Sequence, residues 1–143
     1  MENMTVGKTD HLTIDAKREN LSQVLSFVDG ILENEDCNMK AMMQIDVAVE
    51  EIFINIASYA YTDSVGEAGI HVTVMEDPKA VEIEFRDSGI PFDPLAKPDP
   101  DTTLPAEERQ IGGLGIYMVK KSMDKVSYEY TDGQNILKIV KSI

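Results

Sequence analysis

Residues 45–60 of this 143-residue chain read IDVAVEEIFINIASYA. Apolar residues fill so much of the segment that a helix over it must be buried around most of its circumference. Asn38 is a suitable N-cap, so the sequence predicts one long helix from there to about Tyr61. Within it Glu51 and Asn55 share one face, being four residues apart. Such a polar pair indicates either a ligand site or a thin solvent-facing stripe beside Glu50, and spacing alone favours the stripe.

The flanking segments alternate between strand-like and helix-like patterns. Before the long helix, residues 10–15 alternate polar and apolar as a strand does, and residues 17–35 have the period of an amphipathic helix. After it, we expect strands over 70–75 and 80–87, a helix over 114–123, and a closing hairpin of 126–131 and 136–143 that turns at Asp132-Gly133. Strands joined by hairpins, with helices gathered between them, favour a two-layer α+β sandwich over a doubly wound parallel sheet.

The composition narrows the class of protein. Apolar residues make up 43% of the chain, and 13 Lys and Arg against 26 Asp and Glu give a net charge of −13. This acidity argues against nucleic-acid binding, which depends on phosphate contacts. No run approaches the ~18 apolar residues of a transmembrane helix, and the first ten residues lack a signal-peptide pattern. We therefore expect one cytoplasmic domain over residues 1–143, with no nucleic-acid or membrane partner.

Two further stretches combine glycine with polar residues. Residues 87–93 read DSGIPFD, where a strand is expected to end. A carboxylate there can accept a hydrogen bond from an amino group, and Gly89 lets a flat ligand approach the backbone; an ordinary Asp-Ser-Gly turn fits the same residues. Residues 112–115 read GGLG and open a helix, so free backbone N–H groups can face an anion. A hinge or a tight packing contact fits that stretch equally well.

The segment between these stretches is long and irregular. Residues 89–111 hold five of the six prolines and show no sustained hydrophobic period. A structureless loop of that length is unusual inside a compact domain and is typical of a functional lid or a disordered segment.

Together the three motifs resemble those of the GHKL ATPases. The motifs, in chain order, are Glu51-x-x-x-Asn55, Asp87-x-Gly89 followed by Pro-Phe-Asp, and Gly113-x-Gly115. The short form is similar to the anti-sigma-factor serine kinases of the RsbW and SpoIIAB type, and the resemblance covers nearly the whole chain. It implies the Bergerat ATP-binding fold, with a mixed, mostly antiparallel sheet covered on one face by helices, and an ATP lid over residues 93–111.

The resemblance also implies a role for each motif residue. Asn55 would coordinate the Mg²⁺ that bridges the ATP phosphates, and Glu51 would be the general base for the attacking hydroxyl. Asp87 would accept from the adenine amino group, with Gly89 allowing the base to lie against the backbone. The remaining ATP-binding residues would lie in or beside the lid: Arg109, Gly113, Leu114 and Gly115, with Lys97 as a second candidate for the lid cation.

The function implied is that of an ATP-dependent serine/threonine protein kinase of the anti-sigma type. Its partners would be an anti-anti-sigma (STAS-type) protein and a sigma factor, and it would act by partner switching as a homodimer. One alternative is a catalytically weak ATP-binding regulatory module. Another is the detached ATP-binding domain of a histidine kinase, although such chains carry a phosphoacceptor histidine on a preceding helical hairpin, whereas His11 and His71 fall in expected strands.

Two groups of side chains outside the motifs also carry expectations. The methionines, including Met39, Met42 and Met43, are predicted to pack in the core and between helices. His11 and His71 are far apart in the sequence and have no other metal-ligating residue beside them, so they do not suggest a metal site.

Overall fold

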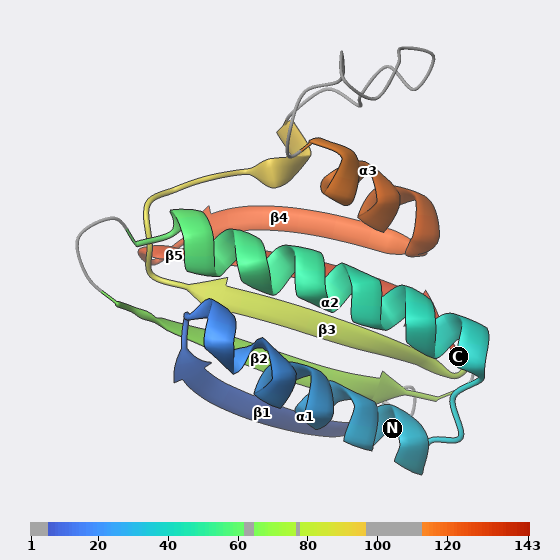
Figure 1. Ribbon diagram of the computed structural model, residues 1–143. Coiled ribbons are helices and arrows are strands. Elements are labelled where there is room, and N and C mark those ends of the chain that lie inside the picture. The colour runs from blue at the N-terminus through green and yellow to red at the C-terminus, as the bar shows by residue number, and fades with distance from the viewer. Residues whose placement is uncertain (1–5, 62–64, 77, 97–112) are drawn as a thin grey trace.

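The computed structural model describes residues 6–61, 65–76, 78–96 and 113–143, which form a two-layer α+β sandwich (Figure 1). One layer is a sheet of five strands: β1 (Val6–Asp15), β2 (Glu67–Met75), β3 (Ala80–Asp87), β4 (Lys125–Thr131) and β5 (Gln134–Ser142). The other layer contains the helices α1 (Leu21–Asn34), α2 (Met39–Tyr59) and α3 (Gly113–Ser122). Short 3-10 turns, η1 (Arg18–Asn20) and η2 (Pro94–Ala96), precede α1 and follow β3. The predicted sandwich is confirmed.

The sheet has the strand order β1-β2-β3-β5-β4, and each neighbouring pair of described strands is antiparallel. The expectation of a mixed sheet is therefore wrong for this part of the chain. The reason lies in the connections. A single crossover helix makes two strands parallel, whereas two antiparallel helices, α1 and α2, separate β1 from β2 and return the chain in the opposite sense. A two-residue turn joins β4 to β5, and only residues 76–79 separate β2 from β3.

The core lies between the helices and one face of the sheet. Strand β3 alternates as predicted, so that Val81, Ile83 and Phe85 are almost fully buried beneath the helices. From the other layer α2 contributes Ile52 and Phe53, also buried. Complete burial of each such side chain contributes roughly 1.5–3 kcal/mol to folding, which fixes α2 firmly on the sheet.

Two local predictions are confirmed at the atomic level. The side-chain oxygen of Asn38 accepts a hydrogen bond of 2.8 Å from the backbone N–H of Ala41, so Asn38 is the N-cap of α2. Asp132 and Gly133 have φ angles of 52° and 78°, the left-handed pair that a two-residue hairpin turn requires.

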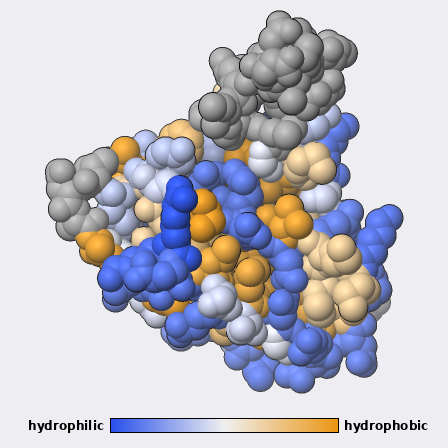
Figure 2. Space-filling model, in the orientation of Figure 1, coloured by the Kyte–Doolittle hydropathy of each residue, from blue (hydrophilic) through white to orange (hydrophobic). Residues whose placement is uncertain are grey.

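The methionine prediction is wrong for the first turns of α2. Met39 and Met43 expose 69% and 61% of their surface, and only Met42 packs partly against the core. Met39 and Met43 are one turn apart on the face of α2 that points away from the sheet. Figure 2 shows apolar colour at the surface over this end of α2.

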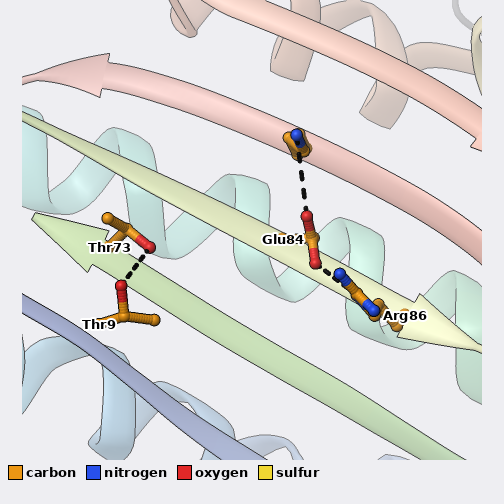
Figure 3. Close-up of polar contacts among 5 residues, drawn as sticks. Thr9, Thr73, Glu84 and Arg86 are labelled. Atoms are coloured by element: carbon orange, nitrogen blue, oxygen red, sulfur yellow. Dashed lines mark hydrogen bonds and ion pairs between the residues drawn. The ribbon is translucent and has the colours of Figure 1, made fainter. Parts of the chain in front are cut away.

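The second face of the sheet is open and polar. The hydroxyl groups of Thr9 and Thr73 lie 3.0 Å apart across β1 and β2, and the carboxylate of Glu84 on β3 pairs with Arg86 (Figure 3). Its other oxygen lies 3.8 Å from the ammonium group of Lys138 on β5. The contacts of Thr9 with Thr73 and of Glu84 with Lys138 cross between strands and stabilise this sheet face, which none of the described helices covers (Figure 1).

The two histidines meet on this face, although the sequence separates them widely. His11 on β1 is the direct cross-strand partner of His71 on β2, and their rings stack with centroids 5.5 Å apart. Burial lowers the pKa of His71, while the nearby Glu84 carboxylate opposes that shift. No helix in the described ranges is long and apolar enough to cross a membrane.

Candidate functional site

A hollow opens between the C-terminal half of α2, the adjoining ends of β3 and β5, and α3. Its empty space, the open mouth included, is about 480 Å³. Apolar side chains make up much of its wall, among them Ile52, Ile56, Phe85, Ile116 and Leu137. The polar side chains of Asn55, Asp87 and Asn135 interrupt this wall, and Tyr59 and Tyr128 line it as well.

Asp87 is the buried carboxylate of the hollow, with 6% of its surface exposed. Its Oδ1 atom accepts hydrogen bonds from the Gly89 backbone N–H at 3.0 Å and from the Asn135 side-chain Nδ2 at 2.9 Å. Burial raises the pKa of Asp87, and these two hydrogen bonds oppose the shift. No donor from the described part of the chain reaches Oδ2, so that oxygen can accept a hydrogen bond from a ligand.

Asn135 is a site residue that the sequence prediction missed. It begins the buried part of β5 and is paired in register with Asp87. Besides Asp87, its Nδ2 donates to the Ile90 carbonyl at 2.9 Å, and its Oδ1 accepts from the Phe92 backbone N–H at 3.1 Å and from the Tyr128 hydroxyl. The only signal in the sequence was a carboxamide at the head of the mostly apolar stretch ILKIV, two residues after the Asp132-Gly133 turn.

Gly89 is required by a close backbone approach within the protein. The N–H of the next residue, Ile90, donates to the Ala60 carbonyl at 2.9 Å. A Cβ atom at position 89 would lie only 2.2 Å from that carbonyl oxygen. Gly89 therefore lets the loop after β3 dock on the end of α2, and its role beside a flat ligand stays a prediction.

Glu51 and Asn55 form a joined pair on α2. The Asn55 Nδ2 atom donates to Glu51 Oε2 at 3.1 Å, across one helical turn. Both side chains are half-buried while Glu50 is exposed, so the three do not form the solvent-facing stripe that spacing favoured. Since the amide nitrogen faces Glu51, the Asn55 oxygen is left for a ligand of the hollow that Asn55 lines.

The first turn of α3 lies directly over the Glu51 carboxylate. A Cβ atom at Gly115 would be 2.1 Å from both Cδ and Oε1 of Glu51. Gly113 and Leu114 begin the same helix, as predicted. Backbone N–H groups at a helix start favour negative charge, so this arrangement suits a carboxylate or a phosphate.

The predicted lid is described only in part. Residues 93–96 continue from the loop after β3 and include η2, in which Pro94 is buried. Arg109 and Lys97, the predicted lid cations, lie outside the described residues, as does Gly112. The structure therefore brings together Glu51, Asn55, Asp87, Gly89 and Gly115, from α2, the end of β3 and α3.

Known proteins share this architecture. Residues 14–141 match the family model of the histidine kinase-like ATPase domain. The serine/threonine-protein kinase BtrW of Bordetella bronchiseptica is 25% identical over 131 residues, covering 92% of each chain. The serine-protein kinase RsbW of Bacillus cereus (strain AH187) is 28% identical over 130 residues, which are 88% of this chain and 80% of that relative. The solved RsbU and RsbW domains of Rv1364c from Mycobacterium tuberculosis share the fold, with a TM-score of 0.68 and 14% identity over 95% of this chain and 32% of that longer one.

Proposed function

This chain belongs to the histidine kinase-like ATPase domain family, and on that premise we propose that it is an ATP-dependent serine/threonine protein kinase of the anti-sigma type. The resemblance inferred from the three motifs is confirmed by the family match, and relatives over most of its length are named as serine or serine/threonine kinases. The observation that carries the proposal is the contact between the motifs. Glu51 accepts a hydrogen bond from Asn55 and lies against Gly115. Asn55 in turn lines the hollow that also contains Asp87.

The end of the hollow at Asp87, called the base end because the nucleotide base would lie there, suits adenine. Its apolar walls accept a flat ring, and the free Oδ2 of Asp87 accepts a hydrogen bond from an exocyclic amino group. Gly113, Leu114 and Gly115 would then lie beside the phosphates, with Arg109 of a lid over residues 93–111 as the cation for the γ-phosphate.

The donor set also fits Mg²⁺. Asn55 offers one amide oxygen, and Mg²⁺ commonly takes few protein ligands while it keeps waters and binds phosphate oxygens. When bound, Mg²⁺ supplies neutralisation of the charge on the transferring phosphoryl group. Asn55 would hold it through Oδ1, with the amide orientation fixed by the Glu51 hydrogen bond.

Glu51 would act as the general base. As the serine oxygen of the protein substrate bonds to the γ-phosphorus, the bond from that phosphorus to the β,γ-bridging oxygen breaks and ADP leaves. The hydroxyl proton passes to the Glu51 carboxylate. The relatives' names, serine-protein kinase and serine/threonine-protein kinase, support a protein substrate with a serine or threonine acceptor. From the resemblance of the three motifs, that substrate would be of the anti-anti-sigma (STAS) type, and a sigma factor would be the second partner. The chain would work as a homodimer of single domains over residues 1–143 in the cytoplasm.

Calorimetry with ATP, with and without Mg²⁺, tests the binding half of the proposal. We expect Mg²⁺-dependent binding that falls about 10- to 100-fold in Asp87→Asn, because the acceptor for the base is lost, and that loses its Mg²⁺ dependence in Asn55→Ala. Transfer of the γ-phosphate to an anti-anti-sigma protein of the same organism tests the kinase half. Glu51→Gln should bind ATP and fail to transfer. Absence of ATP binding by the wild type would overturn the proposal, and binding without any transfer would leave a nucleotide-dependent regulatory module.

A further inference from the structure

One side-chain amide joins three segments at the base end of the hollow. Asn135 on β5 contacts the Asp87 carboxylate at the end of β3, the loop backbone at Ile90 and Phe92, and the Tyr128 hydroxyl on β4. Only 6% of its surface is exposed, and its two N–H groups and both oxygen lone pairs are all engaged. Such full use of a buried amide indicates that its orientation is fixed.

We propose that Asn135 is a positioning residue for base recognition, which holds Asp87 so that one carboxylate oxygen always faces the hollow as an acceptor for an exocyclic amino group. The inference rests on the proposed nucleotide-binding function and names a residue that none of the three motifs contains. It assigns the choice of base to a pair, Asp87 and Asn135, that is brought together by the register of β3 and β5.

The orientation of the Asn135 amide follows from its neighbours. The Phe92 backbone N–H can only donate, so the atom of Asn135 that faces it must be the oxygen. The nitrogen then faces two acceptors, the Ile90 carbonyl and Asp87 Oδ1. A flipped amide would set donor against donor at Phe92 and acceptor against acceptor at the other two contacts.

The orientation of Asp87 follows in turn. Its Oδ1 receives two donors, from Asn135 and from the Gly89 backbone, so rotation of the carboxylate would break both hydrogen bonds. Oδ2 is therefore kept toward the hollow, and two donors on the carboxylate favour its charged, acceptor-only form. An acceptor at this place selects the amino group of adenine and rejects the carbonyl oxygen that hypoxanthine carries at the same ring position.

The test compares ATP with ITP, which differs at that one group, in wild type and in Asn135→Asp. This variant keeps the shape of the side chain and the oxygen that accepts from the Phe92 N–H group. It lacks the N–H groups that donate to Asp87 and to the Ile90 carbonyl. The titratable groups nearest to it are Asp87 on β3 and, on β4, Tyr128 and Tyr130, the cross-strand partner of Asn135. Asp93 lies close to Tyr128, and Tyr61 after α2 lies close to Asp87. Two facing carboxylates share one proton, so the loss of ATP affinity should be large at pH 8 and partly reversed at pH 5.5.

We expect the wild type to prefer ATP over ITP by about 10- to 100-fold, and Asn135→Asp at pH 8 to reduce that ratio to about threefold or less. Tyr128→Phe is the matched control, because it removes a donor to Asn135 but leaves both contacts of the amide nitrogen; its ratio should stay within about threefold of the wild-type ratio. Circular dichroism and thermal unfolding establish that each variant is folded.

The outcomes separate this inference from the function on which it rests. A wild type that fails to bind ATP overturns both. A wild type that binds ATP and ITP equally overturns the inference alone and needs no variant. If Asn135→Asp weakens both nucleotides by the same factor, or leaves the ratio and its pH dependence unchanged, the residue is merely structural and the inference is overturned while ATP binding stands.

Discussion

Replacing Gly115 by alanine should uncouple phosphoryl transfer from nucleotide binding. The Cβ atom would lie 2.1 Å from Cδ and Oε1 of the Glu51 carboxylate, and an ordinary contact begins at 3.4 Å. The carboxylate must therefore move by about 1.3 Å. Since the obstacle is the far end of a flexible side chain, Glu51 can yield without disturbing the helices. The fold is kept, and the proposed base is displaced.

The size of the effect follows from that displacement. Misplacing a catalytic group by about 1 Å costs on the order of 100-fold in rate, so we expect γ-phosphate transfer by Gly115→Ala to fall by about that factor. Asp87 is untouched, and displacement of Glu51 weakens at most the one hydrogen bond that its carboxylate accepts from Asn55. ATP affinity should therefore fall by no more than about 10-fold, the worth of about one ordinary hydrogen bond. Alanine is also the better helix former, by up to about 1 kcal/mol, so the free energy of unfolding should not decrease.

The assay pairs single-turnover transfer from γ-labelled ATP to the anti-anti-sigma protein with calorimetry of ATP binding. Gly30→Ala is the matched control, because Gly30 lies within α1 and a Cβ atom there would meet nothing within 4 Å. It should transfer phosphate at the wild-type rate. The reasoning is refuted if Gly115→Ala transfers as fast as wild type. It is equally refuted if ATP binding, rather than transfer, is what falls, because Gly115 would then serve the phosphates and not Glu51.

Three further changes test local features of the fold. Burial and the neighbouring Asp29 carboxylate raise the pKa of Asp46 to about 7 from an ordinary value of 3.8. The stability is therefore fully present below about pH 4 and is lost as the pH rises to 7. Because screening by solvent limits the effect, Asp46→Asn should gain about 1 kcal/mol at pH 8 in urea unfolding and little at pH 4. Gly89→Ala would place a Cβ atom 2.2 Å from the Ala60 carbonyl oxygen, so we expect a loss of about 1–3 kcal/mol and weaker ATP binding; unchanged unfolding midpoints would contradict this. Asn38→Ala removes the N-cap hydrogen bond of α2 and should cost about 1 kcal/mol in thermal or urea unfolding without altering the ATP/ITP ratio.

Elements whose signals are local were predictable from the sequence. Strand β3 occupies the predicted residues 80–87, because its apolar side chains alternate and turn residues end it on both sides. Helix α2 begins after the predicted N-cap, Asn38, and the Asp132-Gly133 turn has the backbone angles that this dipeptide favours. The strand before α1 and the strand β2 begin earlier than predicted, at Val6 and Glu67, because pairing with each other extends both beyond their own alternating patterns.

What the sequence could not supply was the contact between segments. Asn135 reads as an ordinary residue of a hairpin strand until the register of β3 and β5 sets it opposite Asp87. His11 and His71 likewise become neighbours only through the pairing of β1 with β2. The exposure of Met39 and Met43 was mispredicted for the same reason, because a helical pattern indicates which residues share a face and not which face another element covers.

The two ends of the candidate site are built differently, and this bears on how it would work. At the base end, Asp87 and Asn135 are buried and tied to three segments by hydrogen bonds, so an acceptor is held in place before any ligand arrives. At the other end, Glu51 is half-buried. Within the described residues its carboxylate accepts one hydrogen bond, from Asn55, and lies against Gly115, which has no side chain. A fixed acceptor can discriminate between bases, since rotation would cost it two hydrogen bonds, whereas a carboxylate on a flexible stem can turn toward a hydroxyl that a second protein brings. Changes at Asn135 should therefore alter which nucleotide binds, and changes at Gly115 should alter how fast its phosphate is transferred.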